Sequence, residues 1–280
     1  MGVFLAFFSA IVYGCADFCG GKATRKTSVS TVTFTSQLSG LAVLAVGLAL
    51  VPGDGPTVRA LLFGAAGGLG GALGILLLYH GLAVGTMSIV SPVTAVTAAT
   101  IPVAAGTLLF HERPGASALA GVGFAMAAIA LVSLSHGTGS VVDPLRMVTI
   151  AVGAGVGFGL FFVCLQRAGD PKQVGLWALV GARPVSIVLS GVLARRQGHA
   201  AFPSRASWPL VALAGTLDQL ANMLYVLSIG RGLLSVLAVL ASLYPVSTVA
   251  LARVVDHERL RPPQIAGLGF ALAGLVLIGL

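Results

Sequence analysis

Long apolar runs, each about the length of one membrane crossing, follow one another along the whole chain. The hydrocarbon core of a bilayer is ~30 Å thick, so a helix needs about 20 residues to cross it. The runs are separated by short stretches of charged residues, proline or glycine, and they lack the strict alternation of a barrel strand. We therefore expect ten helical membrane spans, at residues 2–21, 30–51, 59–82, 87–109, 116–135, 147–166, 174–194, 207–230, 233–254 and 263–280.

An internal repeat divides these spans into two halves. His-Glu-Arg at 111–113 and Gly-Val-Gly-Phe-Ala at 121–125 recur 146 positions later as His-Glu-Arg at 257–259 and Gly-Leu-Gly-Phe-Ala at 267–271. Each half holds five spans, an odd number, so the second half enters the membrane upside down relative to the first. The predicted fold is an all-α polytopic membrane protein with ten transmembrane helices arranged as two inverted five-helix repeats. We place the first repeat at 1–136, a connecting loop at 137–146 and the second repeat at 147–280.

Composition excludes a water-soluble protein and argues against several kinds of partner. Only 9% of the residues are charged, against roughly 25% in an ordinary globular chain. The net charge of +8 is scattered between the apolar runs rather than clustered with aromatic residues, so we expect contact with membrane lipids and no nucleic acid. The three cysteines lie inside apolar runs, which disfavours a disulfide framework or a four-ligand metal site. We expect no cofactor and no metal.

Ionisable side chains within the spans are the strongest candidates for a functional site. Each costs at least ~2.5–3.5 kcal/mol to insert at membrane depth, so it is a functional candidate by default. Three lie deepest in the predicted spans: Asp17, Arg183 and Asp218. A carboxylate in an apolar wall can bind and release a proton during transport, and Asp17 is therefore the candidate for proton coupling.

The candidate substrate site extends from these three residues to polar and aromatic neighbours. Asp218, Asn222 and Tyr225 recur at i, i+4 and i+7, which places them on one helical face. Gln37 is the repeat counterpart of Arg183, so polar groups are expected at one depth in both halves, around a central cavity. The expected lining consists of Tyr13, Asp17, Gln37, Tyr79, Arg183, Asp218, Asn222 and Tyr225, with Tyr13 and Tyr79 as aromatic walls.

Simpler explanations of these residues stay open. Arg183 and Asp218 could form a structural ion pair that only lets their helices insert, and Asp17 could lie near the interface, partly solvated. The two His-Glu-Arg segments fall in connections, where a charge cluster is usually a solvated turn. Pro102 and Pro245, in the corresponding fourth and ninth spans, predict kinks that suit either moving gates or static packing.

Motifs of soluble enzymes are missing from the sequence. His111-Glu112 and His257-Glu258 lack the second histidine of a zinc-binding H-E-x-x-H motif, and no G-x-G-x-x-G, P-loop lysine or G-x-S-x-G is present. We therefore expect no catalytic residues and no enzymatic activity. The alternative is a membrane-embedded enzyme or scramblase that acts on lipid-linked substrates, and a further one is a passive or chaperone-like membrane subunit.

The chain resembles the drug/metabolite transporter superfamily, and within it the EamA-type transporters with two EamA domains. The resemblance is carried by residues 13–22, by the paired His-Glu-Arg connections and by residues 231–235 and 242–245. It implies secondary transport of small organic solutes, often export, with both termini cytoplasmic. Lys and Arg counts, ten in one set of connections against five in the other, favour the opposite orientation, so the placement of the termini stays open.

Together these observations predict a secondary active transporter in the plasma membrane, the inner membrane of a bacterium. It would move a small organic metabolite or drug by alternating access, as an exporter coupled to protons. Small-molecule solutes and membrane lipids are the expected partners, and a homodimer is one assembly left open. Arg183 would hold a substrate carboxylate or pair with Asp218.

Overall fold

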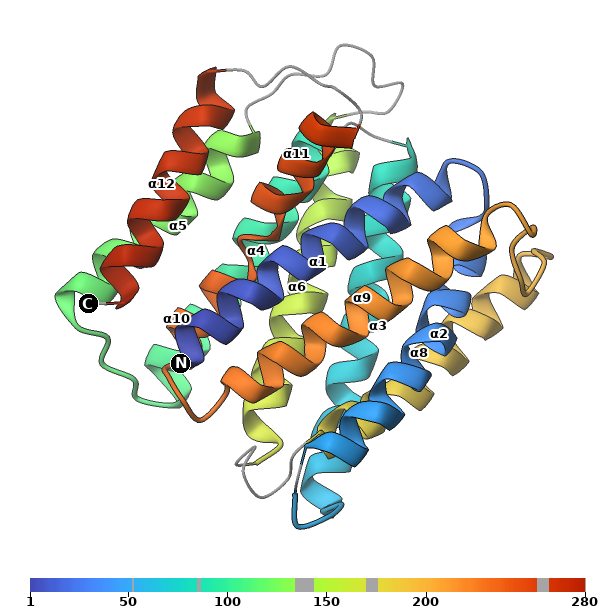
Figure 1. Ribbon diagram of the computed structural model, residues 1–280, viewed down its shortest axis with the longest axis horizontal. Helices are drawn as coiled ribbons and strands as arrows, with labels where there is room; N and C mark the ends of the chain where they lie inside the picture. The colour runs from blue at the N-terminus through green and yellow to red at the C-terminus, as the bar shows by residue number, and fades with distance from the viewer. Residues whose placement is uncertain (52, 85–86, 134–143, 170–175, 256–261, 280) are drawn as a thin grey trace.

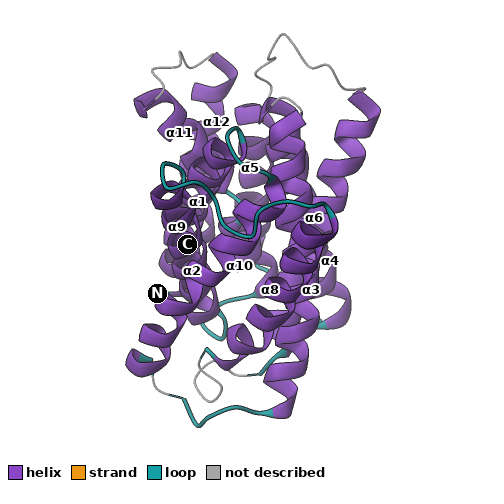
Figure 2. Ribbon diagram, turned by 90° about the vertical axis from the view of Figure 1, so that its right-hand side faces the viewer, coloured by secondary structure: helices purple, strands orange, loops and turns teal. Residues whose placement is uncertain are grey.

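The computed structural model describes residues 1–51, 53–84, 87–133, 144–169, 176–255 and 262–279. Throughout these residues the regular elements are helices (Figures 1 and 2). The helices are α1 (Gly2–Thr24), α2 (Val29–Leu50), α3 (Val58–Val84), α4 (Met87–Leu109), α5 (Ala116–Ser133), α6 (Pro144–Arg167), α8 (Trp177–Arg196), α9 (Trp208–Ser228), α10 (Leu234–Ala241), α11 (Tyr244–Val255) and α12 (Pro262–Gly279).

Helix length and composition confirm a multi-pass membrane protein. Within the described ranges, α1, α2, α3, α6, α8 and α9 are long and apolar enough to cross a bilayer. The apolar segments of the other helices are shorter: Val93–Leu109, Ala116–Ala128, Leu234–Thr248 and Ile265–Gly274. An all-helical membrane fold is therefore established, while the full count of ten spans stays a prediction.

Helix starts follow ordinary capping chemistry. Ser28 precedes α2 and its hydroxyl accepts a hydrogen bond from the backbone N–H of Thr31. Prolines occupy the first turns of α6, α9 and α12, where a missing N–H costs nothing because no carbonyl of the helix would have accepted it. The long apolar runs and these start signals together explain why most helices begin within a few residues of the predicted spans.

The ninth predicted span, 233–254, is broken into two helices, which corrects the expectation of one kinked helix. α10 ends at Ala241 and α11 begins at Tyr244. Pro245 lies in the first turn of α11, and its ring would clash with the carbonyl of Ala241 if the helix were continuous. By contrast, α4 runs through Pro102 and α8 runs through Pro184 without an interruption. Pro102 and Pro245, which lie in corresponding spans of the two repeats, therefore have different effects on their helices.

The two halves of the chain interlock rather than lie side by side. α3 packs against α6 and α8, and α9 packs in the same way against α1 and α2. α4 contacts α6, just as α10 and α11 contact α1, and α5 pairs with α12 at one edge of the bundle (Figure 1). Each of these contacts thus recurs between the equivalent helices when the two halves are exchanged. Phe124 and Phe270, which correspond in the repeat, stack at 5.1 Å between α5 and α12.

Glycines allow this close interlocking. A side chain built at Gly64 or Gly68 on α3 would collide with the backbone of Ala178 or Ala182 on α8. One built at Gly157 on α6 would collide with the backbone of α3. Small residues at such crossings let helix backbones approach one another in a membrane, where packing rather than water exclusion holds helices together.

Candidate functional site

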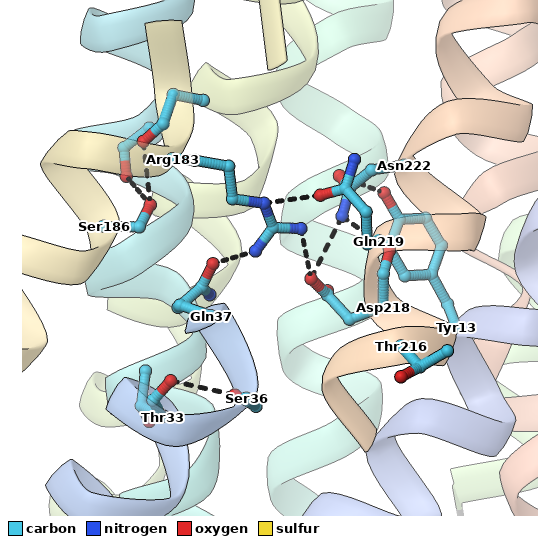
Figure 3. A network of polar contacts seen from close by, with 12 residues as sticks. Tyr13, Thr33, Ser36, Gln37, Arg183, Ser186, Thr216, Asp218, Gln219 and Asn222 are labelled. Carbon is cyan, nitrogen blue, oxygen red and sulfur yellow. Dashed lines mark hydrogen bonds and ion pairs between the residues drawn. The ribbon is translucent and has the colours of Figure 1, made fainter. Parts of the chain in front are cut away.

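Arg183 is the centre of a hydrogen-bond network in the middle of the bundle. It lies on α8, directly before Pro184, and is only 5% exposed. Its Nε donates to Oε1 of Gln219 on α9, and its Nη1 donates to Oε1 of Gln37 on α2. Figure 3 shows the guanidinium reaching between these two helices. Gln37 and Arg183, which occupy equivalent positions of the two repeats, are therefore in direct contact.

An ion pair completes the contacts of the guanidinium. Nη2 of Arg183 lies 3.1 Å from Oδ2 of Asp218, and the two side chains are 6% and 18% exposed. Because desolvating two charges is costly, a buried pair persists only where further hydrogen bonds satisfy both groups. Gln37 and Gln219 provide these hydrogen bonds for Arg183. The ion pair between Arg183 and Asp218, which the sequence leaves as one possibility, is therefore present in the structure.

The network continues from Asp218 to the first helix. The Asn222 side-chain nitrogen donates to Oδ2 of Asp218 at 3.2 Å and to the Asp218 backbone carbonyl at 2.7 Å. The Tyr13 hydroxyl donates to Oδ1 of Asn222 at 2.8 Å. Side chains from α8, α9 and α1 are thereby joined in one chain of polar contacts (Figure 3).

Asp17 lies one turn beyond Tyr13 on α1 and faces the same cavity. It is half-buried, and within the described part of the chain its carboxylate makes neither a hydrogen bond nor an ion pair. The two carboxylates of the site therefore differ in chemistry. Asp218 is held by a cation and an amide, whereas Asp17 is free to take up a proton or a substrate group.

The cavity between the two halves has a polar wall and an apolar wall. It encloses about 720 Å³ when the open solvent at its mouth is counted, and the part enclosed by protein is far smaller. The polar wall comes mainly from α1 and α9, and the apolar wall from α3 and α6. The lining residues are Tyr13, Asp17, Gln37, Gly68, Gly71, Ile75, Ala98, Phe158, Phe161, Phe162, Leu179, Ala182, Arg183, Ser186, Asp218, Asn222 and Tyr244.

Two of the expected lining residues lie elsewhere. Tyr79 is 1% exposed, with its hydroxyl against Gly20 of α1. Tyr225 is fully buried with its ring 4.5 Å from that of Phe162. Seven helical residues advance roughly 10 Å along the axis, so Tyr225 shares the face of Asp218 but lies at a different depth, behind the lining residue Phe162. A helical face predicts direction but not depth.

The lining also contains residues that the sequence reasoning did not name. The three phenylalanines of α6, at 158, 161 and 162, face the cavity together with Tyr244 at the start of α11. The repeat contained a signal for them. Tyr13-Gly14 aligns with Phe158-Gly159, and the same offset of 145 aligns Asp17 with Phe162. The counterparts of the lining residues Tyr13 and Asp17 are thus themselves lining residues.

The described residues hold no group of three or more His, Cys, Asp or Glu side chains that could bind a metal ion. Among the described residues, the cavity has aromatic surface on one side and one compensated cation, one compensated anion and one unpaired carboxylate on the other.

Comparison with known proteins decides the family. The family model described as "EamA-like transporter family" matches residues 1–134 and 145–280. The chain belongs to the EamA-like transporter family. A crystal structure titled only "Crystal structure of protein" has a TM-score of 0.77 to this chain at 18% identity, over 98% of this chain and 95% of that one. At that identity the match shows the fold alone. A search of curated proteins finds no match.

Family membership places the polar network in context. An EamA-like protein is a membrane transporter, and in this one the charged residues deep in the helices gather at a cavity between the two matched halves. The costly charges are therefore located at this cavity.

Proposed function

We propose that this EamA-like chain is a secondary active transporter that exports a small organic metabolite or drug in exchange for protons. It crosses the plasma membrane of a bacterium ten times, as two inverted five-helix repeats, and it is a carrier rather than an enzyme. The observation that carries the proposal is the cavity between the halves, which is lined by Asp17 and by the Arg183–Asp218 pair. Such groups are expensive within a bilayer and are kept for a function.

The two walls of the cavity suit a solute with a polar end and an apolar body. The phenylalanines of α6 offer ring faces to the body, and Tyr13, Asp17 and Asn222 offer polar atoms to the other end. A substrate carboxylate would compete with Gln37 and Gln219 for the guanidinium of Arg183. Exchange between internal and substrate acceptors would let the site bind its solute without leaving a buried charge unpaired.

Asp17 is the proposed carrier of the coupling proton. Its carboxylate has no partner among the described residues, so protonation changes its charge without breaking an existing contact. The charged form of an unpaired carboxylate is costly within a bilayer, which favours exchange of a proton against solute as the cavity changes sides. Asp218 is less suited, because its protonation would leave Arg183 without its counter-ion.

Alternating access follows from the exchange of contacts between the halves. The main contacts between the repeats, α3 with α6 and α8 and α9 with α1 and α2, are counterparts of one another, so rocking the halves by a small rotation would interchange the open and closed ends. The break between α10 and α11 supplies a point where one half can bend next to the cavity residue Tyr244.

A binding screen followed by transport assays tests the proposal. Purified protein is screened by thermal shift against amino acids, organic acids and organic cations at two pH values, because a bound solute stabilises the folded state. Solutes that shift the melting temperature are then tested for counterflow in proteoliposomes, with protein-free liposomes as the control. We expect saturable counterflow of at least one such solute. A protein that no solute stabilises, and whose proteoliposomes exchange none, would contradict a carrier function.

A further inference from the structure

Glu112 binds the N-terminus of α10 rather than lying in a solvated turn, which corrects the expectation for the first His-Glu-Arg segment. Its Oε1 accepts the backbone N–H of Leu234 at 2.6 Å, and its Oε2 accepts that of Ser235 at 3.0 Å. The first N–H groups of a helix have no partner within the helix and carry partial positive charge, so a carboxylate is a strong acceptor for them. The loop of the first repeat thus caps a helix of the second.

Local backbone geometry aims this carboxylate at α10. His111 has a φ of 53°, in the left-handed region that few residues other than glycine adopt. The N–H of Glu112 donates to the carbonyl of Gly106 at 2.9 Å, which folds the loop back onto the end of α4. Gly106 itself has no room for a side chain beside the Glu112 carboxylate. An uncommon backbone conformation and a glycine therefore both serve the same contact.

α10 is placed to close one end of the cavity. All eight of its residues are buried, and it packs against α1, α4, α6 and α9, which are four of the helices that line the cavity. Its C-terminal end reaches the break before the lining residue Tyr244. Its N-terminal end lies where both chain termini lie (Figure 1), and Gly2 contacts Arg231 just before it. α10 therefore lies between Tyr244, which lines the cavity, and the end of the bundle that carries the termini.

Two points of bending bracket α10. Gly230, with a φ of 75°, lies in the short connection from α9, and the break at Ser242 and Leu243 leads into α11. A short helix bounded in this way can move as one piece. The Glu112 hydrogen bonds tie the N-terminal end of α10 to the first repeat, so they help to determine whether α10 stays in place.

We propose that Glu112 is a positioning residue that latches α10 to the first repeat, holding the cavity closed toward the end that carries the termini. The latch opens when the cavity opens at that end. This inference rests on the proposed alternating-access function, because only a carrier needs α10 to move. It predicts that weakening the latch shifts the protein toward the state open on the side of the termini.

A cysteine placed in the cavity measures this shift without any transported solute. Ala98 lines the cavity and is fully buried, so Ala98→Cys reports on access once Cys15, Cys19 and Cys164 are replaced by serine. Inside-out and right-side-out vesicles are labelled with a membrane-impermeant maleimide. We expect Glu112→Ala to speed labelling from the side of the termini by about tenfold or more, because two charge-assisted hydrogen bonds are lost.

Three comparisons separate a latch from general loosening. Glu112→Gln keeps one oxygen acceptor and should give an intermediate rate, and Arg113→Ala, at the exposed neighbouring residue, should leave the rate unchanged. A loosened bundle would label faster from both sides, whereas a released latch speeds labelling only from the side of the termini. Unchanged or symmetric rates in Glu112→Ala would overturn the proposal.

A reversible crosslink tests the same contact in the opposite direction. A Cβ atom at Gly106 would lie 3.3 Å from that of Ser235, close to the ~3.5–4.5 Å spacing of a disulfide. In the Ala98→Cys reporter that also carries Glu112→Ala, which removes the carboxylate that a side chain at position 106 would meet, Gly106→Cys with Ser235→Cys is therefore expected to crosslink α4 to α10. Oxidation should abolish labelling from the side of the termini, and a reductant should restore it. Labelling that continues in the crosslinked protein would overturn the latch, while a carrier function would still be judged by counterflow.

Discussion

Gln37 and Arg183 occupy equivalent positions of the two repeats, 146 residues apart, and they are hydrogen-bonded to each other. Equivalent residues of two symmetric halves can touch only near the axis that relates the halves. The chain has therefore placed a cation on one side of the axis and its amide acceptor on the other. The Phe124–Phe270 stack marks a second point of the same relationship.

The two walls of the cavity include equivalent positions of the two repeats, yet these positions carry unlike side chains. Tyr13 and Asp17 on α1 correspond to Phe158 and Phe162 on α6, and all four line the cavity. Equivalent backbone positions thus carry polar side chains on one wall and aromatic ones on the other. The packing of the two halves is nearly symmetric, while the chemistry of the cavity walls is not; the proposed carrier function would use both features.

Breaking the central ion pair from the side of Arg183 should destabilise the protein strongly. Arg183→Gln leaves the charged, half-buried Asp218 with Asn222 as its one side-chain donor among the described residues, and such losses cost up to about 3–5 kcal/mol. Asp218→Asn in the same chain removes the orphaned charge. We therefore expect the double variant to be more stable than Arg183→Gln alone, as measured by thermal unfolding in detergent.

Arg195→Gln, at an exposed position of the same helix, is the matched control and should change stability by less than about 0.5 kcal/mol. If Arg183→Gln were as mild as Arg195→Gln, the pair would contribute little to folding. Strictly additive losses in the double variant would show that Arg183 and Asp218 are not coupled.

Removing the hydroxyls of two tyrosines should have opposite consequences. The Tyr13 hydroxyl donates to Asn222, so Tyr13→Phe should cost about 1 kcal/mol and leave the Asn222 oxygen without that donor. The Tyr225 hydroxyl is buried without a hydrogen-bond partner in the described part of the protein. Tyr225→Phe should therefore be neutral or stabilising. Melting temperatures of the two variants, measured side by side, check this; a loss in Tyr225→Phe as large as that in Tyr13→Phe would contradict it.

Sequence patterns located the helices and most of the polar residues of the cavity because bilayer thickness and helical periodicity act locally. Asp17, Arg183 and Asp218 were identifiable since a charge within an apolar run is visible without any structure. What escaped prediction depends on distant contacts. Nothing near Glu112 indicates that it caps a helix 122 residues away, and nothing in span nine alone distinguishes the break at Pro245 from the uninterrupted helix at Pro102.

Glycine at the α3–α8 crossing should be required for packing rather than for flexibility. A Cβ at Gly68 would collide with the backbone of Ala182, which cannot rotate away, so Gly68→Ala should cost about 1–3 kcal/mol. Gly123 on α5 has open space at the same atom, and Gly123→Ala should be neutral or stabilising by up to ~1 kcal/mol through helix propensity. Thermal unfolding of both variants decides the matter, and equal tolerance at the two positions would disprove the tight crossing.

Replacing Asp17 should separate solute movement from proton coupling. Asparagine keeps the shape and polarity of the side chain but cannot bind and release a proton. The Asp17 carboxylate makes no hydrogen bond or ion pair within the described residues, so Asp17→Asn should disturb the fold little. In proteoliposomes with an imposed pH gradient, the unmodified protein should accumulate solute against its concentration gradient. Asp17→Asn should only equilibrate it, at any pH.

Asp54→Asn provides the control for this experiment, because Asp54 is an exposed carboxylate between α2 and α3. It should accumulate solute as the unmodified protein does. Arg183 and Asp218 remain paired in both variants, so a loss confined to Asp17→Asn would point to the unpaired carboxylate rather than to the network. Gradient-driven accumulation that survives in Asp17→Asn would assign the coupling ion to another group, with the Arg183–Asp218 pair the next candidate.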